Sequence, residues 1–319
     1  MKVVDHLKKA SKGNGTLFSF EIVPPERGGS AVDLISIVED LVKYKPPFID
    51  ITSHSAEVRY IEKPNNIEKE VKRKRPGTLG ICSLVQWKYG IDAIPHVLCR
   101  GFTREETEDF LIDSNFMSIQ NVLALRGDAK RSDRKEHTSG RSINEYAIDL
   151  VKQIRDMNKG IYLDGLGDNT SFCIGVAGYP EKHPEAPNME TDLKYLKFKV
   201  EAGADYIVTQ MCFDTNIYFK FVEMCRDNGI NIPIIPGIKI IGTKNQLKTI
   251  PRVFKIDIPY ELSDKIEQVK EQEEVENIGI SWAEKQIRSY VNDERVPAVH
   301  IYVTNDIKLV KGVMDKFSR

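Results

Sequence analysis

Three polar side chains of this chain each follow a run of apolar residues: Glu21, Asp128 and Gln210. Enzymes built on parallel sheets carry their catalytic groups at the C-terminal ends of strands and in the loops that follow. A carboxyl group there can move a proton or stabilise a positive charge. Side chains of these types at equivalent strand ends predict one site assembled from several strands.

Glu21 is the most informative of the three, because the run Phe20–Pro25 places it inside an apolar strand ahead of two prolines. Burying an ionised carboxylate is unfavourable, so we expect the pKa of Glu21 to be raised. A carboxylic acid that stays protonated near neutral pH is a ready general acid. The alternative is a glutamate that pairs with a buried arginine or lysine, and the residues alone leave both interpretations open.

The other polar candidates allow more than one role each. Asp128, which follows Gly127, can ligate a metal, cap the next segment or lie against a cofactor. Arg126 can pair with Asp128 or grip a phosphate. His183 lies between prolines that stiffen its loop, either to present its ring or to stabilise a turn. Lys199 is either a surface charge or a group that reaches back to a phosphate.

The composition is that of an ordinary globular protein, with 319 residues, 41% hydrophobic, 29% charged and a formal net charge of −1. The chain lacks the basic excess typical of nucleic-acid binding. Its densest basic run, Lys69–Arg75, is interpreted as the solvated end of a helix. It has no apolar leader and no run of about 18 apolar residues, so we expect a cytoplasmic protein without a membrane partner. Five scattered cysteines predict neither a disulfide framework nor a metal site.

Short apolar runs alternate along the chain with helix-like segments. The runs are nearly continuous in apolar residues, which indicates strands buried on both faces and paired in parallel. The expected strands are Leu17–Val23, Phe48–Thr52, Thr78–Val85, Asn121–Leu125, Phe172–Ala177, Tyr206–Met211, Pro233–Ile238 and Val299–Thr304. The expected helices are Ala31–Tyr44, Arg104–Ser114, Ile143–Met157, Thr191–Ala202, Asn216–Asn228 and Ile278–Val291. This alternation predicts an α/β fold, a single (β/α)8 TIM barrel over residues 1–319.

An open, doubly wound sheet is the alternative fold. It requires a glycine-rich dinucleotide turn after an early strand, but Leu17–Val23 runs directly into two prolines that cannot form such a phosphate cradle. Two loops, 129–142 and 158–171, are either lids or plain solvated loops. In the barrel, strand ends and the loops after them would gather Glu21, Thr52, His96, Asp128, Tyr179, His183 and Gln210.

A set of motifs in this chain resembles the methylenetetrahydrofolate reductase family. The motifs are Phe20–Pro25, Leu125–Asp128, Gly178–Ala186, Thr209 with Gln210, and Ile235–Ile238 followed by Gln246. They occur in the family's order and span nearly the whole chain. The resemblance implies a barrel flavoprotein with FAD at the C-terminal face of the strands. It further implies reduction of 5,10-methylenetetrahydrofolate to 5-methyltetrahydrofolate with NADH or NADPH, a step of one-carbon metabolism and methionine biosynthesis.

The resemblance also implies a role for each matching position. Glu21 matches the general acid that protonates folate N10. Asp128 matches a carboxylate beside the flavin, where its charge disfavours the anionic reduced flavin and stabilises the substrate cation. Gln210 and Gln246 match glutamines that contact folate. The positions matching FAD contacts are Thr52, His96, Leu125, Arg126, Gly127, Asp128, Ala147, Tyr179, His183, Asp192 and Lys199.

Several positions depart from the bacterial pattern of the family: Ser53–Ala56, Tyr195, Phe198, Ile250 and Asp306. The acid, the flavin carboxylate and the glutamines are kept. We therefore expect the same reaction with altered binding of FAD and folate, and a ping-pong cycle in which nicotinamide leaves before folate binds. We also expect a homo-oligomer that acts on small molecules and needs no metal.

Two other functions stay open at this point. A cofactor-free barrel lyase or aldolase would use Lys199 or Lys239 to form a Schiff base. A non-catalytic folate- or flavin-binding protein would have lost turnover through the departures near Phe198 and Asp306. The preference between NADH and NADPH is not readable, because the chain has no dinucleotide-binding motif with its acidic residue.

Overall fold

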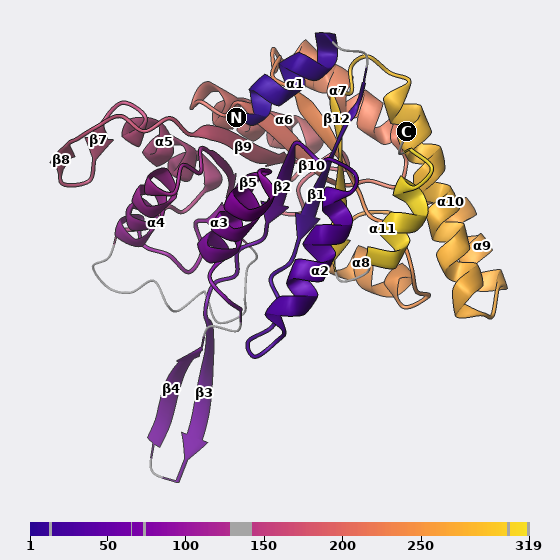
Figure 1. The fold of residues 1–319 in the computed structure, drawn as a ribbon, viewed down its shortest axis with the longest axis horizontal. Coiled ribbons are helices and arrows are strands. Elements are labelled where there is room, and N and C mark those ends of the chain that lie inside the picture. Colours follow the sequence, from indigo (N-terminus) through magenta and orange to yellow (C-terminus); the bar gives the residue numbers. More distant parts are fainter. Residues whose placement is uncertain (13–14, 65, 73–74, 128–141, 305–306, 318–319) are drawn as a thin grey trace.

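The computed structural model describes residues 1–12, 15–64, 66–72, 75–127, 142–304 and 307–317. Within them, eight parallel strands close into a barrel in the order β1-β12-β11-β10-β9-β6-β5-β2 (Figure 1). These strands are β1 (Leu17–Ile22), β2 (Phe48–Ile51), β5 (Asp92–Leu98), β6 (Asn121–Leu125), β9 (Cys173–Gly178), β10 (Tyr206–Met211), β11 (Ile234–Ile238) and β12 (Ala298–Thr304). The prediction of a (β/α)8 barrel is confirmed.

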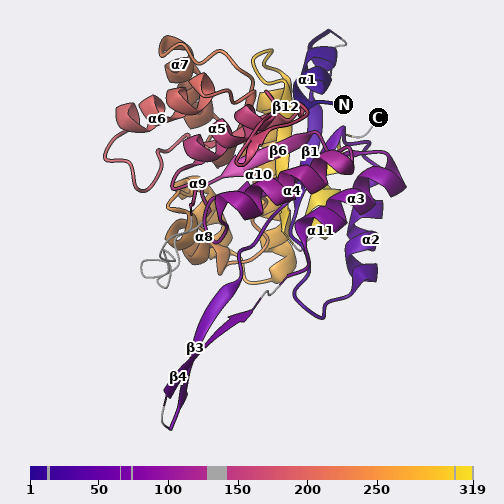
Figure 2. The same cartoon turned by 90° about the vertical axis from the view of Figure 1, so that its left-hand side faces the viewer.

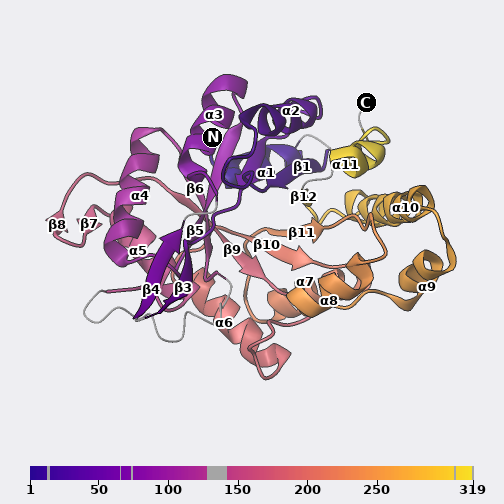
Figure 3. The ribbon, with the colours of Figure 1, turned by 90° about the horizontal axis from the view of Figure 1, so that it is seen from below.

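Helices surround the strands, as the view along the barrel in Figure 3 shows. They are α1 (Val3–Lys12), α2 (Ala31–Val42), α3 (Thr78–Tyr89), α4 (Arg104–Phe116), α5 (Ala147–Met157), α6 (Met189–Glu201), α7 (Thr215–Asp227), α8 (Gln246–Phe254), α9 (Tyr260–Gln268), α10 (Gln272–Val291) and α11 (Ile307–Met314). No helix within the described ranges is long and apolar enough to cross a membrane.

Helix α1 closes the barrel at the N-terminal ends of the strands. Val3 and Leu7 are buried against the apolar side chains that fill this end of the interior. The backbone N–H of Val3 donates to Asn121 Oδ1 at the start of β6, over 2.8 Å. His6 Nε2 lies 2.6 Å from Asp92 Oδ2 at the start of β5. The C-terminal strand ends, where the sequence predicts the site, therefore lie at the other end of the barrel.

The prediction of a strand over Thr78–Val85 is wrong, because this segment begins helix α3. Its buried residues Thr78, Ile81, Cys82 and Val85 recur at helical spacing, and the run of apolar residues concealed this period. The strand that takes its place in the barrel is β5. The expected strands did not include this segment, which contains Pro95. His96, expected after a strand, therefore lies inside β5.

The interpretation of Lys69–Arg75 as a helix end is also wrong. Residues Asn66–Lys72 form strand β4, which pairs antiparallel with β3 (Glu57–Lys63). Figures 1 and 2 show this hairpin extending from the end of the barrel opposite α1. It follows β2 directly, so it belongs to the end where the site is expected.

The structure bears differently on the two loops that were considered as lids. Most of loop 129–142 lies outside the described residues. Loop 158–171 carries a short hairpin of β7 (Ile161–Tyr162) and β8 (Gly165–Leu166) and leads into the start of β9. It therefore lies near the N-terminal strand ends, away from the predicted site, and does not act as a lid there.

Helix α10 packs directly on the chain that leaves β11. A Cβ atom at Gly279 of α10 would overlap the backbone carbonyl oxygen of Ile241. Backbone cannot move aside as a flexible side chain can, so this position accepts only glycine without a shift of the helix. The close contact fixes the path of the loop that leads to Gln246.

We predict that Gly279→Ala lowers the free energy of unfolding by about 2 kcal/mol or more, because α10 must move away from Ile241. The matched control is Gly80→Ala in helix α3, where an added Cβ meets nothing within 4 Å. This control should be neutral or stabilising by up to about 1 kcal/mol through helix propensity. Urea unfolding of both variants measures the difference. Equal effects of the two substitutions would show that the close contact does not constrain α10.

Candidate active site

Glu21 lies near the C-terminal end of β1, with its side chain inside the barrel and 16% exposed. In the sheet, Glu21 pairs with Asp50 of β2 on one side and Tyr302 of β12 on the other. Glu21 Oε2 is 3.4 Å from His96 Nε2 and 3.8 Å from His300 Nε2. Among the described residues, the predicted acid thus has imidazoles beside it and forms no ion pair with arginine or lysine.

Asp50 and His300 lie beside Glu21, and both are almost completely buried. His300 Nδ1 is 3.8 Å from Asp50 Oδ2 and 2.9 Å from Ser19 Oγ. His96 Nε2 is 3.8 Å from Asp50 Oδ1. We call Glu21, Asp50, His96 and His300 the carboxylate–histidine cluster.

The expectation of a raised pKa for Glu21 is wrong. Burial acts to raise the pKa, but the attraction of His300, with smaller effects of His96 and His54, outweighs burial and lowers it. At neutral pH, His300 is the cation responsible, because burial lowers the pKa of His96 to about 4 and leaves that ring neutral. The alternative, that Glu21 pairs with a buried arginine or lysine, named the wrong kind of partner, because the fold supplies a histidine.

Asp50 responds to burial as an ordinary aspartate does, whereas His300 departs from the usual behaviour of a buried histidine. Burial raises the pKa of Asp50 to about 7, against the attraction of His300. Burial acts to lower the pKa of His300, but its interactions with Glu21 and Asp50 outweigh that effect and raise it. Asp50 and His300 therefore each keep a proton to higher pH than an ordinary aspartate or histidine does.

Arg126 follows β6 and connects two loops at the C-terminal end of the barrel. Its guanidinium forms an ion pair with Glu185, and its Nε donates to the backbone oxygen of Glu145. The guanidinium carbon also lies 4.7 Å from the ring centre of Tyr146. The expected partner Asp128 lies outside the described residues. Leu125 ends β6, and Gly127 has a φ of 83°, a left-handed conformation that favours glycine.

A second group of predicted residues lies between β9 and α6. The rings of Tyr179 and His183 meet edge to face with centroids 4.6 Å apart. The backbone N–H of His183 donates to Asp192 Oδ2 over 2.8 Å. Lys199 Nζ donates to the backbone oxygen of Ala177 over 2.7 Å, and burial lowers its pKa to about 8. Helix α6 thus ties the loop after β9 to the barrel.

The remaining predicted residues belong to neither of these groups. Ala147 is the first residue of α5. The Gln210 side-chain oxygen accepts from the backbone N–H of Met211 over 2.9 Å. The Gln246 side-chain oxygen accepts from the backbone N–H groups of Gly242 and Thr243, so it shapes its own loop. No interaction of the described residues joins these side chains to Glu21.

The side chains expected to hold FAD fit a polar, partly anionic group. Thr52 Oγ1 and His96 Nε2 are buried and have no hydrogen-bond partner among the described residues. Buried polar atoms of this kind are normally satisfied, so a ligand is a natural partner. The amine of Lys199 would suit a phosphate. Among described residues, no three His, Cys, Asp or Glu side chains are grouped to hold a metal ion.

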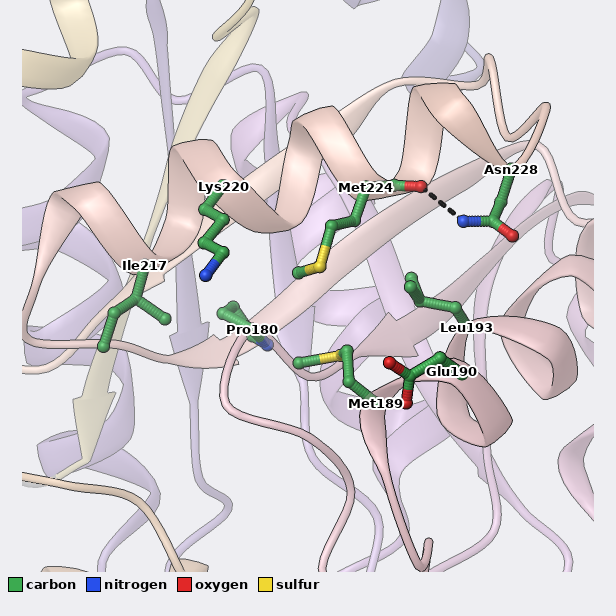
Figure 4. A pocket seen from close by; sticks show the side chains of 8 residues that line it. All are labelled: Pro180, Met189, Glu190, Leu193, Ile217, Lys220, Met224 and Asn228. Atoms are coloured by element: carbon green, nitrogen blue, oxygen red, sulfur yellow. Dashed lines mark hydrogen bonds between the residues drawn. The ribbon is translucent and has the colours of Figure 1, made fainter.

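A hollow of about 520 Å³ lies elsewhere, on the outside of the barrel between α6 and α7 (Figure 4). It is lined by Pro180, Met189, Glu190, Leu193, Ile217, Lys220, Met224 and Asn228. None of the predicted site residues lines it. We place the site at the carboxylate–histidine cluster because the titratable groups meet there.

The sequence analysis missed two residues of the cluster, Asp50 and His300, and also Ser19, which contacts His300. Each stands inside an apolar strand: Asp50 between two isoleucines, His300 between Val299 and Ile301. The reasoning that singled out Glu21, a polar residue in an apolar run, would have identified these two as well.

Comparison with known proteins identifies the family of this chain. The sequence model of the family described as methylenetetrahydrofolate reductase matches residues 6–318. The chain belongs to the methylenetetrahydrofolate reductase family. It is 34% identical to "Methylenetetrahydrofolate reductase (NADH) 1" of Arabidopsis thaliana over 98% of this chain and 50% of that protein. It is 28% identical to "5,10-methylenetetrahydrofolate reductase" of Pectobacterium carotovorum subsp. carotovorum over 91% and 86% of the two chains.

The chain spans about half the length of the first curated relatives it matches, such as the Arabidopsis protein. A "Probable methylenetetrahydrofolate reductase (NADPH)" of Caenorhabditis elegans is 30% identical over 90% of this chain and 40% of its own. Among solved structures, an uncharacterised protein from Clostridium thermocellum has a TM-score of 0.59 and 14% identity. That alignment covers 98% of this chain and 99% of the other, and it supports the barrel fold.

Replacing Asp50 by asparagine tests the electrostatics of the cluster. Because the pKa of Asp50 is about 7 in the folded protein and 3.8 ordinarily, folding binds a proton between these values. Its contribution to stability is full below about pH 4 and is lost as pH rises through about 7. Relative to Asp50→Asn, the wild type should lose stability over this interval with a slope approaching 1.4 kcal/mol per pH unit. Denaturant unfolding at several pH values measures this, and a flat difference would contradict it.

Proposed function

We propose that this chain reduces 5,10-methylenetetrahydrofolate to 5-methyltetrahydrofolate with reduced nicotinamide, using bound FAD. The observation that carries the proposal is Glu21, a carboxyl group held at the strand-end side of the barrel interior beside His300. The matched family and the order of its motifs support the substrate. The proposal treats residues 1–319 as one reductase domain.

In this proposal, Glu21 is the general acid. Its proton goes to N10 of the substrate, the bond between N10 and the methylene carbon breaks, and a cation forms at N5. A single positioned acid contributes about 10²–10⁴-fold to such a step. When bound, FAD supplies a hydride carrier between nicotinamide and the folate. We propose a ping-pong order, because one face of the site would serve both substrates in turn.

The residues proposed to hold FAD are those with suitable donors at the strand ends. Thr52 Oγ1 and His96 Nε2 would meet polar ring atoms, and Lys199 would meet a phosphate. Arg126, held by Glu185, would keep the loop after β6 in place. Asp128 remains the proposed carboxylate that tunes the flavin, and Gln210 and Gln246 the proposed folate contacts. Either NADH or NADPH is the electron donor.

One observation favours a lyase that uses a Schiff base: burial lowers the pKa of Lys199 to about 8, which suits a nucleophilic amine. The amine nevertheless donates to Ala177 O, and the family assignment supports a reductase. Flavin absorbance of the purified protein would support the reductase. Trapping of Lys199 with borohydride and a carbonyl substrate, in a protein without flavin, would support the lyase.

The Glu21→Gln variant separates the two half-reactions. Reduction of the flavin by nicotinamide needs no proton from Glu21 and should stay within about twofold of wild type, whereas oxidation by the folate should slow by about 100-fold or more. Stopped-flow absorbance follows both steps. The matched control is Glu190→Gln, an exposed glutamate at the outer hollow. If both half-reactions of Glu21→Gln fell equally, Glu21 would not be the acid.

A further inference from the structure

Glu21 is placed where its ionised form is favoured, although the proposed reaction needs it protonated. Burial acts to raise its pKa, but the histidines, led by His300, lower it below the ordinary value. An acid of this kind is ionised at neutral pH before the substrate arrives. Its proton must therefore come from a neighbouring group.

His300 is the neighbour that can carry this proton. His96 is nearer, at 3.4 Å, but burial keeps it neutral above about pH 4. His300 Nε2 is 3.8 Å from Glu21 Oε2, and the ring is completely buried. A displacement of about 1 Å brings this pair to hydrogen-bond distance.

The role of Glu21 as general acid does not explain why the carboxyl group of Asp50 is buried beside it. Asp50 is completely buried, and neither side-chain oxygen has a hydrogen-bond partner among described residues. Its ion-pair partners within 4 Å in the described part of the chain are His96 and His300. A buried carboxyl group with both oxygens unsatisfied is costly, so a structural role alone does not account for it.

We propose that Asp50 and His300 form an internal proton store for Glu21, in which His300 supplies the proton and Asp50 is the positioning residue that keeps it on His300. This inference rests on the proposed function and adds to it two residues without an assigned role. His300 then lies between two carboxyl groups, with Glu21 facing Nε2 and Asp50 facing Nδ1.

The proton transfer balances without any further reactant. The Nε2–H bond of His300 breaks, and an O–H bond forms on Glu21 Oε2, which converts an ion pair into two neutral groups. Glu21 then gives the proton to the substrate nitrogen and returns to the carboxylate. After the product leaves, a proton from solvent restores the imidazolium. The store matters because a bound folate would cover Glu21, whose side chain is only 16% exposed even in the absence of ligand.

The tyrosines and the cysteine that face Asp50 and His300 do not carry charge near neutral pH. Burial is the main cause of the raised pKa values of Tyr206 on β10, Tyr302 on β12 and Cys82 on α3, so each stays protonated and neutral. Ser19 Oγ lies 2.9 Å from His300 Nδ1 and can accept its proton in a hydrogen bond. His54 acts on Glu21 and His96 through its charge.

Asp50→Asn in the FAD-loaded enzyme tests the store, because the amide keeps the shape and cannot bear the negative charge. Reduction by nicotinamide should stay within about twofold of wild type, and oxidation by methylenetetrahydrofolate at about pH 8 should slow by tenfold or more. The alkaline limb of the folate step should move to lower pH by about one unit, because His300 loses its proton earlier. A merely structural role of Asp50 would lower the rate without moving this limb.

The matched control is Asp92→Asn, a carboxylate on β5 that binds His6 at the closed end of the barrel. Its folate step should keep the wild-type pH profile. If Asp50→Asn also kept that profile, the store would be wrong while the proposed function stood. If wild-type enzyme did not pass electrons to the folate at all, the proposed function would fail instead.

A measurement on the wild type stands even if Asp50→Asn does not fold. Histidine NMR of the holoenzyme, with the His300 signal assigned from His300→Gln, gives the titration of that ring directly. The store requires a midpoint above the ordinary value of 6.5. A His300 that titrates below this value would carry no proton at neutral pH, and the inference would be overturned whatever the enzyme turns over.

Discussion

The constraint on which the site depends is the burial of two carboxyl groups on adjacent strands, with a histidine placed against both. Glu21 and Asp50 pair across β1 and β2, and His300 arrives from β12 on the other side of β1. Two buried carboxylates so close would repel each other, and each would lose hydration. The imidazole of His300 compensates for both effects.

This arrangement makes the site a property of the closed barrel. Glu21 belongs to the first barrel strand and His300 to the last, and the two strands meet only because the sheet closes. The closed end is filled by apolar side chains and by α1, so the polar cluster lies toward the C-terminal strand ends. Around those ends, Arg126 with Glu185 and Lys199 with Ala177 fix the loops after β6 and β9. The proposed acid itself lies beside residues of β2, β5 and β12.

The sequence predicted correctly those strands whose run of apolar residues matches their buried place in the barrel. The runs at Asn121–Leu125 and Tyr206–Met211 are strands with the expected bounds. Thr78–Val85 was mistaken for a strand because its run of apolar residues conceals the helical period of its buried positions. Strand β5, which takes its place in the barrel, was not among the expected strands. For the site, Glu21 was found from its unusual surroundings. The sign of its pKa shift could not be found, because it depends on His300, about 280 residues away in sequence.

Transfer of reducing equivalents from nicotinamide through the enzyme to folate tests the central claim most directly. The protein is reduced anaerobically with unlabelled nicotinamide in deuterium oxide, where the exchangeable N5–H of a reduced flavin becomes N5–D. It is then freed of nicotinamide and mixed with 5,10-methylenetetrahydrofolate. A ping-pong reductase predicts oxidised enzyme and 5-methyltetrahydrofolate with one deuterium in its methyl group, measured by mass spectrometry. Reduced enzyme that stays reduced, or a methyl group without label, would contradict the account.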